Sequence, residues 1–111
     1  MSFGKHIRLL RVQNVLSLRE LARRVDMEFG YLSRIEREEV PPPSEAKVIA
    51  LATVLNEDPD VLLAMAGKVS PALVEIICRR PQMLASLIRE LKDAPDHAIL
   101  RIVREVRDGD W

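Results

Sequence analysis

The chain has 111 residues, 48% of them apolar, which is enough for one compact domain or a small domain with an appendage. Seventeen Lys and Arg balance seventeen Asp and Glu. Up to Gly67 there are nine basic and ten acidic residues, and beyond it eight and seven, so net charge does not favour a nucleic-acid partner. The single cysteine excludes an internal disulfide, and no apolar run approaches the roughly 20 residues that span a bilayer, so we expect a cytoplasmic protein.

The chain is predicted to be all-α. Only four residues are aromatic, and no stretch alternates apolar and polar residues as a half-buried strand would. The first helix is predicted over residues 4–14. Its inward side chains are Ile7, Leu10 and Leu9, and the basic residues between them face solvent.

Residues 17–37, SLRELARRVDMEFGYLSRIER, indicate two short helices joined by a tight turn. Ser17 and Glu20 have the spacing of a capping box at the start of the first of these helices. Leu18, Leu21, Ala22 and Val25 fall on one helical face. After a turn at residues 26–27, the second helix has Tyr31, Leu32 and Ile35 on its inner side. The pattern predicts a helix-turn-helix, and residues 29, 30, 33, 34 and 37 are left on the outer side.

The next two helices have clear start and stop signals. Three prolines at 41–43 interrupt any helix, and Ser44 is a suitable N-cap for the helix that follows. Asn56 fits the end of that helix. Asp58 followed by Pro59 begins another, and Gly67 ends it. The side chains expected in the core are Val48, Ile49, Leu51, Ala52 and Leu55 from the fourth helix and Val61, Leu62, Leu63 and Met65 from the fifth.

Beyond Gly67, three prolines each open a further helix, predicted over residues 71–79, 81–91 and 95–106. Three short helices bury little surface by themselves, so they must pack on the first domain, a second copy of the chain or another partner. We expect a dimer interface here, with the last helix as the best seam. The residues expected at this dimer interface are Leu84, Leu87, Ile88, Ile99, Ile102 and Val106. Cys78 is expected to be a small buried apolar residue, and residues 108–111 a loose tail.

The chain resembles the phage-repressor, or xenobiotic-response-element, family of helix-turn-helix DNA-binding regulators. The resemblance rests on Leu10-Arg11, SLRELARRV, YLSRIER, LATVL and DVLLAMAG, and it covers about residues 3–67. It implies a five-helix DNA-binding domain at residues 1–67, and the three helices at 68–111 are then a dimerisation or partner-binding extension. It also implies that Arg11 pairs with Glu36, which would make Arg11 structural.

The same resemblance implies which residues contact double-stranded DNA when the second helix of the motif enters the major groove. The base-contacting positions are Phe29, Gly30, Ser33 and Arg34, with Arg34 suited to guanine and Phe29 to a thymine methyl. Packing of Phe29 on the domain surface is an equal alternative, and Arg34 could instead pair with Glu38. The phosphate-contacting positions are Ser17, Leu18, Arg19, Arg23, Arg37 and Lys47, with Ser17 and Leu18 at a helix N-terminus.

Several residues depart from the family pattern. Leu18 replaces a common glutamine, Asp26 and Glu38 replace glycines, and Glu28 replaces a Ser or Thr cap. The acidic groups at Glu28, Glu38 and Glu39 lie close to where phosphates are expected. They leave open that the fold serves protein contacts and has lost DNA binding.

The leading hypothesis is a transcriptional regulator, most simply a repressor, that acts as a homodimer. An alternative is an antitoxin or partner-regulated repressor, since members of this family often sit beside a toxin or a zinc metallopeptidase. His6 and His97 lack companion ligands, so no metal site is expected. No nucleophile–base spacing or glycine-rich phosphate loop is present, and so neither a cofactor nor an enzymatic activity is predicted.

Overall fold

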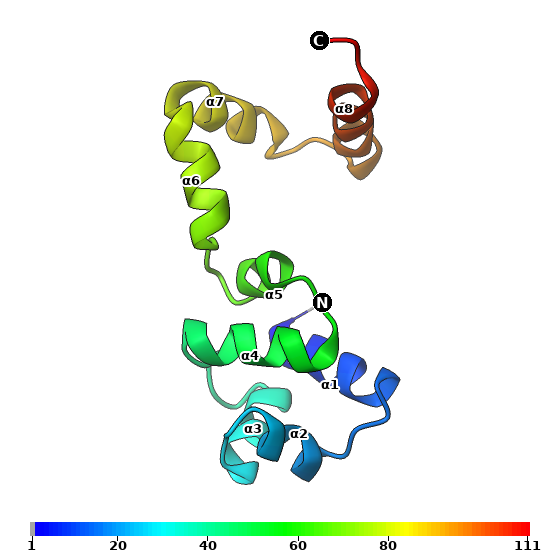
Figure 1. Cartoon of the computed structure of the whole chain (residues 1–111), viewed down its shortest axis with the longest axis vertical. Coiled ribbons are helices and arrows are strands. Elements are labelled where there is room, and N and C mark those ends of the chain that lie inside the picture. The colour runs from blue at the N-terminus through cyan, green and yellow to red at the C-terminus, as the bar shows by residue number, and fades with distance from the viewer. Residues whose placement is uncertain (1) are drawn as a thin grey trace. The chain divides into compact units, whose positions relative to one another are not determined.

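The computed structural model describes residues 2–111, which form helices and no strands (Figure 1). Their bounds are α1 Phe3–Gln13, α2 Leu18–Arg24, α3 Phe29–Glu36, α4 Glu45–Leu55, α5 Pro59–Met65, α6 Pro71–Arg79, α7 Pro81–Leu91 and α8 Asp96–Asp108. The all-α prediction is confirmed, as are five helices followed by three. Contacts divide the chain into two units, Met1–Leu73 and Val74–Trp111. The division at Gly67 stays a prediction.

The first unit has a single aliphatic core to which all five helices contribute. Its buried side chains include Ile7 of α1, Leu21 of α2, Leu32 of α3, Leu51 of α4 and Leu62 of α5. The apolar spacing predicted most of this core. Leu9, Ile49 and Val61 were wrongly placed inside and are exposed, whereas Phe3 and Gly4 are buried. A Cβ on Gly4 would lie 2.2 Å from the carbonyl oxygen of Ile35, so glycine permits α1 to pack closely against α3.

Sequence signals at the helix starts are largely confirmed. The Oγ atoms of Ser17 and Ser44 accept from the amides of Glu20 and Lys47 at 3.0 and 3.4 Å, and Asp58 Oδ1 accepts from the amide of Asp60 at 2.8 Å. The second half of the predicted capping box differs. The Glu20 carboxylate accepts from two arginines of its own helix, because both lie one turn further along the same face.

Helices α1 to α5 all end with the same backbone conformation. Each helix is followed by a residue with a left-handed φ: Val15 (56°), Asp26 (53°), Glu38 (63°), Asn56 (57°) and Gly67 (79°). The amide of the next residue then bonds to a carbonyl five residues earlier, as in Met27 N to Ala22 O at 2.8 Å and Glu39 N to Arg34 O at 2.9 Å. This is the Schellman arrangement, which satisfies carbonyls that the helix leaves unpaired.

A buried ion pair joins α1 to the end of α3. Arg11 Nε and Nη2 donate to the two carboxylate oxygens of Glu36 at 2.8 and 3.0 Å, and Arg11 Nη1 donates to the carbonyl of Leu16 at 3.0 Å. Glu36 is only 7% exposed. The hydrogen bonds that Arg11 donates to the Glu36 carboxylate raise the pKa of Arg11. The structural role predicted for Arg11 is therefore confirmed.

The second unit lacks a core of its own. No residue of α6, α7 or α8 is buried. Their starts and stops follow the prolines as predicted, although α8 extends to Asp108 into the expected tail. The prediction for Cys78 was wrong: its side chain is exposed, since no element of its own unit covers that part of α6. None of the helices described is long and apolar enough to cross a membrane.

Replacing Val15 with glycine is expected to stabilise the protein. The left-handed φ of 56° at Val15 costs a β-branched residue about 1–2 kcal/mol. Val15 is 89% exposed, so packing of its side chain does not compensate for this cost. After the greater backbone freedom of glycine in the unfolded chain is deducted, we expect the free energy of unfolding to rise by about 0.5–1 kcal/mol. Val12→Gly, inside α1, is the matched control and is expected to lower it by about as much. Urea unfolding measures both, and a loss in Val15→Gly would contradict the strain at this turn.

Removing one partner of the buried ion pair is expected to be costly. Arg11→Met leaves the Glu36 carboxylate buried without its cation, and we expect the free energy of unfolding to fall by about 3 kcal/mol. Arg101→Ala breaks the exposed Arg101–Glu105 pair and serves as the control, with an expected change below about 1 kcal/mol. Urea unfolding measures the free energy of unfolding of both variants. Equal effects of the two substitutions would show that the burial of Glu36 adds nothing.

Candidate nucleic-acid interface

The helix-turn-helix is formed by α2 and α3, which pack against each other (Figure 1). Leu21 and Ala22 of α2 and Leu32 and Ile35 of α3 face the core. The turn between the helices uses the left-handed φ of Asp26, a position where the family often has glycine. Aspartate adopts this conformation more readily than most residues, so the departure at Asp26 is compatible with the motif.

Lys47 of α4 fixes this turn from the side. Its Nζ donates to the carbonyl oxygens of Val25 and Asp26 at 2.9 and 2.8 Å, where α2 ends. A cation at a helix C-terminus also interacts favourably with the helix dipole. Lys47 therefore has a structural role that the sequence did not reveal, because the contact spans 21 residues. Its predicted phosphate contact stays a prediction.

Phe29, the first residue of α3, lies beneath an arginine of α2. The Arg19 guanidinium carbon is 4.4 Å from the centre of the Phe29 ring, and Phe29 remains 40% exposed. Such a cation–π contact is worth about 0.5–1 kcal/mol at an exposed site. The two alternatives for Phe29 are thus not exclusive. Arg19 covers part of the ring, and the rest is open on the outer side of the motif.

The remaining predicted base-contacting residues lie along the same helix. Gly30 and Ser33 are half-buried, and Arg34 is exposed. Within residues 2–111, the Arg34 guanidinium has no hydrogen-bond or ion-pair partner. The alternative pairing with Glu38 does not form, because Glu38 lies at the end of α3 facing the N-terminal turn of α1.

Three other arginines of the motif have acidic partners. Arg23 and Arg24 donate to Glu20 at 2.9 and 3.2 Å, and Arg37 donates to Glu39 at 3.0 Å. All three arginines are exposed, so these pairs contribute little to stability and can exchange for other anions. The phosphate contacts predicted for Arg23 and Arg37 stay predictions, as do those for Ser17 and Leu18.

Glu38 has a structural explanation. Its carboxylate lies near Ser2 and the amides of Lys5 and Gly4, and these groups lower its pKa. The Ser2 hydroxyl does not reach hydrogen-bonding geometry, so the favourable contribution is that of a negative charge at the N-terminal turn of α1. One acidic residue expected to oppose phosphate is therefore occupied within the domain.

Among residues 2–111, no group of His, Cys, Asp and Glu is arranged to hold a metal ion.

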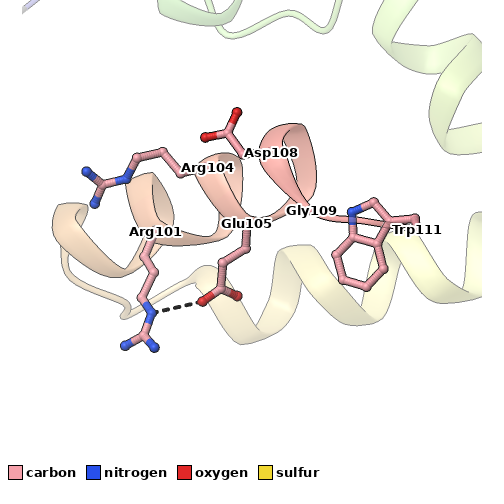
Figure 2. Close-up of a pocket in the computed structure, with 6 residues that line it drawn as sticks. All are labelled: Arg101, Arg104, Glu105, Asp108, Gly109 and Trp111. Carbon is pink, nitrogen blue, oxygen red and sulfur yellow. Dashed lines mark hydrogen bonds and ion pairs between the residues drawn. The ribbon is translucent and has the colours of Figure 1, made fainter.

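The predicted dimer residues lie in the second unit. Leu84, Ile99 and Ile102 are half-buried, whereas Leu87, Ile88 and Val106 are exposed. Figure 2 shows the end of α8, where Trp111 turns back along the helix beyond Gly109. Trp111 Nε1 donates to the carbonyl of Val106 at 3.0 Å, and yet its side chain is 90% exposed. The end of this helix thus presents further uncovered apolar surface.

Comparisons with known proteins agree with this geometry. A family model described as a helix-turn-helix domain matches residues 2–65. The structure is similar to the "crystal structure of the master regulator for biofilm formation SinR in complex with DNA", with a TM-score of 0.52 and 33% sequence identity over 55% of this chain and 97% of that one. No curated protein gives a significant match. The chain belongs to the helix-turn-helix family of phage-repressor type, whose members are DNA-binding regulators.

Proposed function

We propose that this protein is a sequence-specific transcriptional repressor that binds double-stranded DNA with α3 in the major groove. The observation that carries the proposal is the outer side of α3. There the exposed ring of Phe29 and the unpaired Arg34 guanidinium lie on one helix that the core and Lys47 hold in place. An arginine can donate to both guanine acceptors, and an aromatic ring can lie against a thymine methyl. We accordingly propose a cytoplasmic location.

The neutral charge of the chain is compatible with this proposal. Phosphate attraction depends on the local distribution of charge, and Arg19, Arg23, Arg34 and Arg37 all lie on the exposed sides of α2 and α3. The ion pairs of Arg23 and Arg37 are solvent-exposed, so phosphates can replace the carboxylates at small cost. Binding should accordingly be strongly weakened by salt.

We further propose that the protein acts as a homodimer on a pseudo-palindromic operator. The exposed apolar side chains of α7 and α8 support this, since a second copy would cover the surface that the unit leaves open. The two α3 helices would then lie about 34 Å apart, one turn of DNA. A toxin or a regulatory metallopeptidase could cover the same surface, and the second experiment below distinguishes these partners from a second copy.

The first experiment is an unbiased selection of duplexes with the full chain, followed by binding to the selected site at several salt concentrations. Arg34→Ala is expected to weaken binding about 10-fold to 100-fold, because the substitution removes a bidentate base contact. Arg24→Ala is the matched control. It removes the same charge from α2 at a residue with no assigned DNA contact and should change affinity by about two-fold or less. If no duplex is enriched, or binding does not depend on salt, DNA recognition is the wrong function.

The second experiment measures the oligomeric state by sedimentation. We expect the wild type to be a dimer, and Leu87→Glu, Ile88→Glu or Val106→Glu to produce monomers with at least about ten-fold weaker operator binding, since a charge would be buried in an apolar interface. Val61→Glu is the control, because Val61 is a comparably exposed apolar residue of the first unit. A wild type that stays monomeric at tens of micromolar would favour a different partner for the second unit.

A further inference from the structure

Glu28 occupies the N-cap of α3 but does not cap it. Its backbone is extended, as an N-cap requires, and yet its side chain makes no capping hydrogen bond. The carboxylate is exposed and has no ion-pair partner within the part of the chain that the structure describes. A free negative charge at the helix that faces DNA would repel phosphates, so it needs another explanation.

The position of Gly30 supplies one. A Cβ built at Gly30 would lie 3.2 Å from Glu28 Oε1 and 3.8 Å from Arg34 Nη1. An acceptor and a donor of opposite charge therefore both lie close to the residue that has no side chain. They do not form an ion pair with each other, so both remain available to a ligand approaching the backbone at Gly30.

The edge of a C·G base pair in the major groove complements this arrangement. Guanine presents two acceptors, O6 and N7, and cytosine presents the N4 amino group as a donor. We propose that Glu28, Gly30 and Arg34 together read a C·G pair. Arg34 donates to guanine, Glu28 accepts from the cytosine amino group, and Gly30 allows the base edge to approach the helix. This inference rests on the proposed function and names what that site recognises.

The acidic group contributes to selectivity through repulsion as well as attraction. A carboxylate at this place meets another acceptor when the cytosine is replaced by thymine or guanine, so the wrong base is opposed by an unpaired buried charge. Glu28 also keeps the motif from holding DNA of any sequence through phosphates alone. Its two effects on binding therefore have opposite signs, and a substitution can separate them.

Duplex selection with the full chain, in the wild type and in Glu28→Ala, tests the inference. We expect the wild-type site to contain a C·G pair in each half at which replacement of cytosine by thymine weakens binding about ten-fold or more. In Glu28→Ala that preference should fall about five-fold, and the part that Arg34 contributes through the paired guanine should remain, while affinity for unrelated duplexes rises because a repulsive charge is gone. Glu39→Ala is the matched control. It removes the same charge beyond the other end of α3 and should leave the base preference intact.

Gly30→Ala provides a second variant that is not expected to lose stability, since alanine favours the helix more than glycine does. Thermal unfolding should confirm this, and binding to the selected site should weaken about ten-fold because the methyl group obstructs the base edge. An unchanged cytosine preference in Glu28→Ala, or full affinity in Gly30→Ala, would overturn the inference and leave DNA binding itself standing. If the wild type enriches no duplex, the proposed function fails and this inference fails with it.

Discussion

The buried contact between Arg11 and Glu36 joins α1 to the last residue of α3 through polar groups. One guanidinium binds both oxygens of a carboxylate at the last residue of α3 and also the carbonyl of Leu16, between α1 and α2. A planar group with five donors suits this geometry, whereas lysine could not satisfy it. The orientation of α3 therefore depends on polar contacts at both of its ends, with Lys47 fixing the turn before it and Arg11 its last residue.

The sequence predicts the elements of this fold well because its local signals agree with one another. Ser44, the Asp58-Pro59 pair and Pro71 each mark a helix start, and Asn56 and Gly67 mark helix ends. Periodicity was less reliable about burial. Leu9, Ile49 and Val61 lie on apolar helix faces and yet are exposed, because the pattern gives the width of a face and not the position of the helix that covers it. Cys78 was misjudged for the same reason.

The candidate site could be predicted only in outline. The outer residues of α3 follow from helical geometry and from the family resemblance, but their partners come from far away in the sequence. Arg19 meets Phe29 across ten positions, and Lys47 reaches Val25 across twenty-two. The acidic residues also looked alike in the sequence and differ in the structure. Glu38 lies at the N-terminal turn of α1, Glu39 pairs with Arg37, and Glu28 has no partner among residues 2–111, so only Glu28 needs a functional explanation.

The absence of a core in α6 to α8 has a consequence for the steady-state concentration of this protein in a cell. Helices without buried side chains derive their stabilisation from whatever covers them, so in the proposed homodimer the folding of this part of the chain is linked to the concentration of the second copy. At low abundance the uncovered helices would open readily and expose backbone to proteases. Dimerisation would then determine the lifetime of the subunit as well as its affinity for DNA. A small change in the rate of synthesis would produce a steep change in the concentration of dimer.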